Sequence, residues 1–303
     1  MSESEEDIKL SAMVTELRPK SLQADTAHYF RDRQIIQVHG DLAGLANIAT
    51  GPAPGQGGRG TFISLLTRDG FLDADLYVVP FQDSVLVDVH NELAKHVAMR
   101  LKSLDGVETV DSSATDRWRI FGELPDQKAA DTPFEAIRFG DPRRREAGNR
   151  VFRDADEPES FDWRHARKWD GHAMRLGLLP DHRCVIGKKI TLKEAGYHKL
   201  LGKPDAAETE DIDRRVLPVR IDPREKHVPV MAGQPLLAGG EPFGTMLDQE
   251  GVCGVALIDL EPWREALAAE KRLKCMDVPI LITWPTWLSS ESEGHYGPAG
   301  DLI

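Results

Sequence analysis

The fold of this chain follows from the stretch TRDGFLDADLYVV (67–79) together with SVLVDVHNELAKHVAMRLKSL (84–104). Asp69-Gly70 is a strong turn dipeptide, and Gln82-Asp83-Ser84 supplies a second turn before the apolar run SVLVDV. Apolar residues bounded by such turns are typical of strands. The stretch therefore predicts two or three strands in succession.

A helix is expected directly after these strands. Asn91 can cap it, because a short polar side chain can accept from the first backbone N–H groups of a helix. The helix runs through about Leu104, with apolar residues at helical spacing: Leu93, Val97, Leu101 and Leu104. Strands followed by an amphipathic helix indicate an α+β unit. Two further strands are expected, RQIIQVHGD (33–41) and RWRIFGEL (117–124).

The segments around these elements are less regular. GPAPGQGGRG (51–60) has five glycines and two prolines, so it predicts a surface loop, or a lid near a ligand. Residues 125–160 carry clusters of charge with few apolar residues between them and predict loops with short strands. Helical character returns from Trp163 through Leu179.

The C-terminal third has a different pattern. KPDAAETEDID (203–213) is polar and acidic and predicts a linker. After it, residues 214–222 and 233–260 alternate short apolar runs with glycine turns, as a small β-barrel does. A helix is expected over 263–273 and a last strand over 278–284.

The composition is that of a globular protein with 303 residues, of which 41% are hydrophobic. A formal net charge of −12 disfavours nucleic acid as a partner, because phosphate backbones are themselves anionic. The N-terminus MSESEEDIKL lacks the pattern of a signal peptide, and no apolar run is long enough to predict a membrane span. Three widely spaced cysteines are typical of a reducing compartment. A cytoplasmic location away from membranes is expected.

Three stretches carry a resemblance to a known family. IIQVHGDLAGLANIAT (35–50) is similar to the family's strand, Gly-Asp turn and following helix. Residues 67–104 are similar to its hairpin, strand and helix, and 215–222 with 238–258 resemble its C-terminal barrel. The chain resembles the YgfZ branch of the folate-binding aminomethyltransferase superfamily, the glycine cleavage T-protein-like proteins. The resemblance implies an α+β fold, with a folate-binding-type region of one or two subdomains over 1–205 and a β-barrel domain over 214–290.

The chain departs from that family at two places. The branch carries a Lys-Gly-Cys-aromatic-x-Gly-Gln-Glu motif before the barrel, and the nearest string here, HRCVIGKK (182–189), keeps only Cys184 and Gly187. Setting TLKEAGYHKLLG (191–202) on the family's glutamate-containing segment instead leaves the motif deleted and Cys184 an ordinary cysteine. The second departure is Ala74-Asp75, which stands where the transferases carry two aspartates. Alanine cannot exchange a proton with a folate nitrogen. Asp73 is expected on the opposite face of the strand from Ala74.

The candidate site residues follow from the resemblance. Glu194 matches a glutamate that hydrogen-bonds the pterin ring, because a carboxylate can accept two hydrogen bonds from an aminopyrimidine edge. The alternative is a glutamate on a helix surface. Asp75 either faces a central cavity or is exposed on its strand. Tyr197 and Tyr29 could stack on a pterin or p-aminobenzoyl ring, or pack in the core. Arg119, with Arg117, could pair with folate carboxylates, or lie on a solvated face.

Three functions remain open. The resemblance implies a tetrahydrofolate-binding accessory protein that supports the maturation or repair of iron–sulfur proteins, which would be its partners. A tetrahydrofolate-dependent aminomethyl or one-carbon transferase is the second, and Ala74 argues against it. The third is a paralogue that has lost its ligand and serves as a protein-interaction module. No metal site is expected, because His165 and His172 have no further ligands at suitable spacing.

Overall fold

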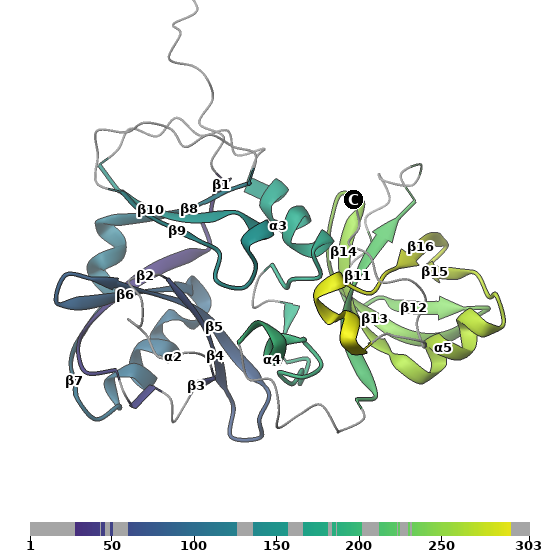
Figure 1. Cartoon of the computed structure of the whole chain (residues 1–303), viewed down its shortest axis with the longest axis horizontal. Coiled ribbons are helices and arrows are strands. Elements are labelled where there is room, and N and C mark those ends of the chain that lie inside the picture. The colour runs from purple at the N-terminus through teal and green to yellow at the C-terminus, as the bar shows by residue number, and fades with distance from the viewer. Residues whose placement is uncertain are drawn as a thin grey trace, which may run out of the picture.

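The computed structural model describes residues 28–42, 44–45, 49–50, 60–125, 136–156, 166–180, 184–185, 187–201, 212–222, 224, 230 and 232–291. Most of the loop expected at 51–60, most of the linker expected at 203–213, and His165 lie outside these residues. The described elements form two antiparallel sheets and a closed barrel (Figure 1).

The first sheet has six strands in the order β3-β4-β5-β6-β2-β7. Both expected turns join its strands: Gly70 lies between β4 and β5, and Gln82 lies between β5 and β6. Their φ values, +83° and +53°, are those of tight turns. The strands expected over 33–41 and 61–89 are confirmed. The strand bounds are β2 (Arg33–Gly40), β3 (Ala49–Thr50), β4 (Thr61–Leu66), β5 (Leu72–Phe81), β6 (Ser84–His90) and β7 (Val107–Asp111).

Helix α2 (Asn91–Lys102) covers one face of this sheet (Figure 1). Its cap is one residue earlier than predicted, because Nδ1 of His90 accepts from the N–H of Glu92. The Asn91 side chain instead donates to the carbonyl of Arg31, at 3.1 Å. The helix buries Ala94, Val97 and Leu101 against the sheet.

Strand β5 has two differently buried faces. Ala74 and Leu76 belong to the apolar cluster beneath α2, whereas Tyr77 belongs to the core on the other side of the sheet. The pairing of β4 with β5 shifts register next to Ala74. Asp73 therefore lies on the helix side with Ala74, where Arg100 and His96 contact its carboxylate, at 2.7 and 2.8 Å. The prediction that Asp73 and Ala74 face opposite ways is wrong, because an irregular register breaks the alternation.

The second sheet has four strands in the order β1-β8-β10-β9 and packs on the face of the first sheet that α2 leaves open (Figure 1). The shared core contains edge-to-face ring pairs, such as Phe81 with Trp118 at 5.5 Å. β8 confirms the strand expected at 117–124. The elements here are β1 (His28–Tyr29), 3₁₀-helix η2 (Ser112–Asp116), β8 (Trp118–Glu123), β9 (Ala136–Gly140), 3₁₀-helix η3 (Arg145–Ala147) and β10 (Asn149–Asp154).

Two short helices connect the sheets to the barrel. Helix α3 (Ala166–Arg175) buries Trp169 in the shared core and packs on barrel strands β13 and β14. Helix α4 (Tyr197–Leu200) lies between the sheets and the barrel (Figure 1). Val216 and Leu257 of the barrel belong to the same cluster as Trp169, so the two parts share one core.

The C-terminal part is a closed barrel in the order β11-β14-β13-β12-β15-β16. It also has a core of its own, in which Trp263 and Trp284 lie nearly parallel, 6.4 Å apart. Together with the two sheets it confirms the α+β fold. The elements are β11 (Arg214–Ile221), β12 (Pro235–Ala238), β13 (Glu241–Glu250), β14 (Cys253–Asp259), α5 (Leu260–Ala268), β15 (Leu273–Cys275), β16 (Val278–Ile282) and 3₁₀-helix η7 (Thr286–Glu291). Within the described residues, no helix has both the length and the apolar content to cross a bilayer.

Candidate functional site

The candidate site centres on the carboxyl group of Asp75. It lies on the side of β5 that faces the second sheet, and Asp75 is 7% exposed. One carboxyl oxygen accepts from Ser64 Oγ at 3.1 Å and the other from the Tyr197 hydroxyl at 3.0 Å. Burial raises the pKa of Asp75 above its ordinary value, and the two hydroxyls with Arg143 and Arg33 offset only part of that effect. A carboxyl that takes up a proton readily can both donate and accept hydrogen bonds.

Two tyrosines line this position and remain protonated. Burial raises the pKa of Tyr197 well above its ordinary value, and the nearby Asp75 charge raises it further. Burial raises the pKa of Tyr77 to about 12. The Tyr197 ring packs edge-to-face against Phe62, 5.2 Å between centroids, which fixes the direction of its hydroxyl.

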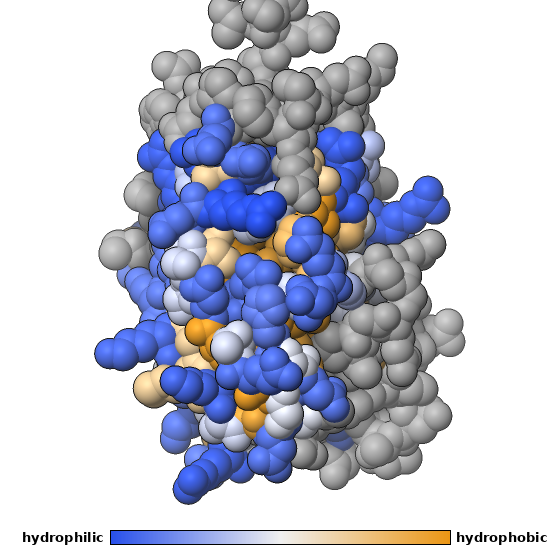
Figure 2. All heavy atoms as spheres, turned by 90° about the vertical axis from the view of Figure 1, so that its left-hand side faces the viewer, coloured by the Kyte–Doolittle hydropathy of each residue, from blue (hydrophilic) through white to orange (hydrophobic). Residues whose placement is uncertain are grey.

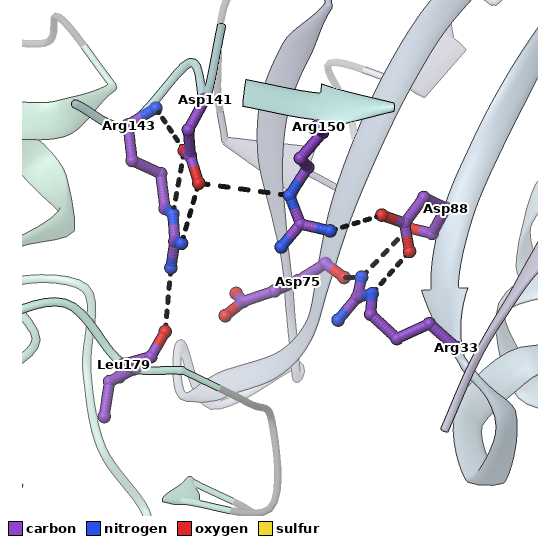
Figure 3. A network of polar contacts seen from close by, with 7 residues as sticks. All are labelled: Arg33, Asp75, Asp88, Asp141, Arg143, Arg150 and Leu179. Atoms are coloured by element: carbon purple, nitrogen blue, oxygen red, sulfur yellow. Dashed lines mark hydrogen bonds and ion pairs between the residues drawn. The ribbon is translucent and has the colours of Figure 1, made fainter. Parts of the chain in front are cut away.

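A chain of buried ion pairs runs beside Asp75 (Figure 3). Asp88 contacts Arg33 and accepts from Arg150 at 2.6 Å. Arg150 Nε lies 3.9 Å from Asp141, which binds Arg143 through both carboxylate oxygens at 3.1 and 2.9 Å. The chain joins β2 and β6 of the first sheet to β10 and the preceding loop of the second.

This network holds more positive than negative charge. Burial opposes ionisation of Asp141, but the guanidiniums of Arg143 and Arg150 lower its pKa overall. Three guanidiniums, Arg33, Arg143 and Arg150, thus face the carboxylates of Asp88 and Asp141. The Arg150 guanidinium carbon also lies 3.4 Å from the centroid of the Tyr77 ring, whose negative face attracts a cation.

Glu194 lies at the junction with the barrel and is 8% exposed. Its carboxylate accepts from the Thr191 N–H at 2.7 Å, and Thr191 Oγ1 accepts from the Glu194 N–H at 3.2 Å, as in a capping box. The other carboxylate oxygen accepts from Arg214 Nε at 2.7 Å. The Glu194 carbonyl accepts from the Val216 N–H at 2.7 Å. Glu194 therefore ties the α4 segment to strand β11.

The structure brings together some of the predicted residues and separates others. Asp75 and Tyr197 are in contact, and Glu194 lies three residues before Tyr197. Tyr29 and Arg119 lie on the other face of the four-stranded sheet. Tyr29 packs on Phe121, 5.3 Å between ring centroids, and alternation places Arg119 on that same face.

Sequence reasoning missed the ion network. Asp88 stands inside the apolar run SVLVDV, and a charge within a buried strand is a signal that a partner must exist. Asp141, Arg143 and Arg150 lie in the segment expected to form loops with short strands, yet each is at most 4% exposed. Nothing in the sequence pattern identified Ser64 as a partner of Asp75.

The remaining predicted groups have ordinary surroundings. Cys184 is buried, and its Sγ lies 3.8 Å from Asp248 Oδ2 of β13. Nε2 of His172 lies 2.7 Å from the Glu146 carbonyl oxygen. In the part of the chain that the structure describes, no three His, Cys, Asp or Glu side chains gather in a way that could hold a metal ion.

Comparison with known proteins supports this fold. Residues 214–290 match the family model described as the CAF17 C-terminal beta-barrel domain, well under half of the chain. Among solved structures, the chain is similar to the glycine cleavage system aminomethyltransferase T from Bartonella henselae, with 11% identity, a TM-score of 0.50 and 84% of each chain covered. At that identity the similarity shows the fold alone. A search of curated proteins finds no match.

Proposed function

We propose that this chain binds a reduced folate, with Asp75 and Tyr197 in contact with the pterin ring and Glu194 beside them. The observation that carries the proposal is the buried Asp75 carboxyl, held by two hydroxyls where the first sheet meets the α4 segment. A carboxyl that gains a proton readily can exchange two hydrogen bonds with an aminopyrimidine edge. The aminomethyltransferase-like fold supports the same ligand class.

Charge favours the same region. A folate carries carboxylates on its glutamate tail, and the network beside Asp75 holds three guanidiniums against the two carboxyl groups of Asp88 and Asp141. Guanidiniums pair well with carboxylates. The surplus cation stabilises an anionic ligand that approaches this side of the sheet, whereas the overall charge of −12 would repel it.

The test is a titration of the full chain with tetrahydrofolate and 5-formyl-tetrahydrofolate, followed by heat or tryptophan quenching. Asp75→Asn and Tyr197→Phe should each weaken binding about tenfold or more, which is about 1.4 kcal/mol. Tyr29→Phe is the matched control for Tyr197→Phe, because Tyr29 lies on the far face of the second sheet. Absence of binding up to millimolar ligand, with the protein folded, would contradict the proposal.

Glu194 needs a separate readout, because it also holds the structure together. Glu194→Gln loses the charge that pairs with Arg214, so its stability has to be measured beside its folate affinity. A loss of affinity at unchanged thermal midpoint assigns Glu194 to the ligand. A loss of both assigns it to the junction between α4 and β11.

We further propose a cytoplasmic accessory role, in which the folate-bound protein supports the maturation or repair of iron–sulfur proteins. The resemblance described from the sequence motivates this role, with 1–205 as the folate-binding region and 214–290 as the barrel domain. The measurement is the activity of iron–sulfur enzymes in cells that lack the chain. Wild-type chain should restore it and Asp75→Asn should not; equal rescue by both would contradict the role of the folate site.

A one-carbon transferase is the second candidate, and one observation favours it. Ala74 belongs to the cluster beneath α2, whereas Asp75 faces the site. The alanine at 74 therefore does not remove the carboxyl group from the site, which weakens the argument against catalysis. Turnover of a one-carbon donor in the presence of tetrahydrofolate, lost in Asp75→Asn, would support this function. Folate binding without turnover favours the accessory role. The absence of both folate binding and turnover favours an interaction module.

A further inference from the structure

A groove lies on the opposite side of the first sheet from Asp75, between α2 and the edge strand β7. Its volume is about 420 Å³. One wall is a stripe along α2, and the other comes from β2, β7 and the start of η2. The lining residues are Gln34, Asn91, Ala94, Lys95, Ala98, Met99, Lys102, Val110 and Ser112.

The α2 wall has a regular pattern. Asn91, Lys95, Met99 and Lys102 follow one another at intervals of four, four and three residues, so they lie on one helix face. The eleven steps from Asn91 to Lys102, at about 1.5 Å each, give this stripe a length of about 16 Å. Its length is that of a peptide helix of about three turns, or of a short extended peptide.

The middle of the groove is apolar. Met99 is 60% exposed, more than any other large apolar residue in the described part of the chain. Ala98 and Val110 are half-buried beside it. The side of the molecule that carries β6 and β7 is otherwise largely hydrophilic, with small separate apolar patches (Figure 2). An exposed flexible thioether is typical of surfaces that accommodate apolar side chains of a partner.

The groove is also positively charged. Lys95 and Lys102 are exposed and line it, and no carboxylate does. Neither ammonium group has an ion pair or hydrogen bond within the described part of the chain. Asp111, between the lining residues Val110 and Ser112 in the sequence, accepts from the N–H and Oγ of Ser113, at 2.8 and 2.7 Å. A basic groove on a chain of net charge −12 is complementary to an acidic partner.

We propose that this groove is a docking site for an acidic, partly apolar peptide segment of a partner protein. Carboxylates of the segment pair with Lys95 and Lys102, and an apolar side chain between them packs on Met99 and Val110. Such a segment binds as an amphipathic helix laid along α2. The site goes beyond the proposed folate function and does not depend on it, because the sheet separates it from Asp75.

The test selects peptides without presupposing the partner. The full chain is immobilised and panned with a phage-displayed library of random peptides of about 12 residues, long enough to follow the stripe. The proposal expects enriched sequences that combine aspartate or glutamate with large apolar residues. No enrichment, or enriched sequences without acidic residues, would overturn it.

Matched variants locate the binding. A selected peptide should bind the Lys95→Glu/Lys102→Glu variant about tenfold or more weakly than wild type, which is about 1.4 kcal/mol. Lys95→Arg/Lys102→Arg should retain binding, because the positive charge is kept. Lys168→Glu/Lys271→Glu changes two exposed lysines outside the groove and gives the same net charge.

Circular dichroism establishes that each variant is folded, so a loss of binding reports on the groove. Equal affinity for wild type and Lys95→Glu/Lys102→Glu would contradict the proposal. If Lys95→Glu/Lys102→Glu and Lys168→Glu/Lys271→Glu lose the same peptide affinity, the loss comes from the overall charge, and the proposal is overturned too. If sodium citrate shifts the resonances of α2 while no acidic peptide is enriched, the groove binds small anions and the peptide proposal fails.

Discussion

Replacing Asp88 with asparagine tests whether the buried ion network stabilises the pairing of the two N-terminal sheets. Asp88 is 0% exposed and contacts both Arg33 and Arg150. Asparagine keeps the shape but loses the charge and turns an NH₂ group toward one guanidinium. Removing one partner of a buried ion pair costs about 3–5 kcal/mol, because the other charge stays buried without compensation. At roughly 2–4 °C per kcal/mol, the thermal midpoint should fall by about 6–20 °C.

Thermal unfolding followed by circular dichroism measures this effect, with Asp73→Asn as the matched control. Asp73 also contacts an arginine, Arg100, and lies in the same sheet, but its carboxylate is 22% exposed. A partly exposed pair is worth about 1 kcal/mol or less. If Asp88→Asn loses no more stability than Asp73→Asn, the buried network does not hold the sheets together and the reasoning is refuted.

Three further changes test separate parts of the structure. Burial raises the folded-state pKa of Asp75, so the free energy of unfolding of the wild type falls as pH rises through that pKa. In urea titrations Asp75→Asn should therefore be more stable relative to wild type at neutral pH than at pH values below the ordinary aspartate pKa, and a pH-independent difference would contradict this. Glu270 has φ +49° where α5 ends in a Schellman motif, a conformation that glycine adopts without the steric cost of a Cβ, so Glu270→Gly should stabilise the protein by about 0.5–1 kcal/mol in thermal unfolding. Ala269→Gly is the control and should not stabilise it, because Ala269 has φ −90°. Gly122→Ala would place a Cβ 2.6 Å from the Trp169 ring and should cost about 1–3 kcal/mol, whereas Gly140→Ala in the same sheet meets no atom closer than 4.0 Å; equal thermal midpoints would contradict the close packing of α3.

Local chemistry accounts for what could be predicted of the fold. The turn at Gly70 and the strands on either side follow from neighbouring residues, as does the helix after His90. The cap was misplaced by one residue because an imidazole nitrogen, not an asparagine oxygen, accepts the first N–H. Periodicity predicts that a helix exists more reliably than it predicts the residue at which it begins.

The candidate site was predictable only in part. Asp75 and Tyr197 were named from the resemblance, and their contact, across 122 residues of sequence, came from the fold. Tyr29 and Arg119 were grouped with them because aromatic and basic side chains suit a folate. Strand alternation on β8 turns Arg119 to the face where Tyr29 packs on Phe121, away from Asp75.

The sequence by itself determined the central strands and turns of the first sheet with the helix after them, the α+β class and the barrel at the C-terminal end, because each depends on residues close together in the chain. The helix expected over 263–273 was placed too late, since α5 ends at Ala268 and Leu273 begins strand β15. Only the tertiary structure decided which charges meet. Asp88 is separated by 55 residues from Arg33 and by 62 from Arg150. Their pairing depends on sheet register, and a shift of one residue turns a side chain to the other face. Register also decides the position of Asp75. The irregular pairing of β4 with β5 turns Asp73 and Ala74 toward α2, and Asp75 then points to the site.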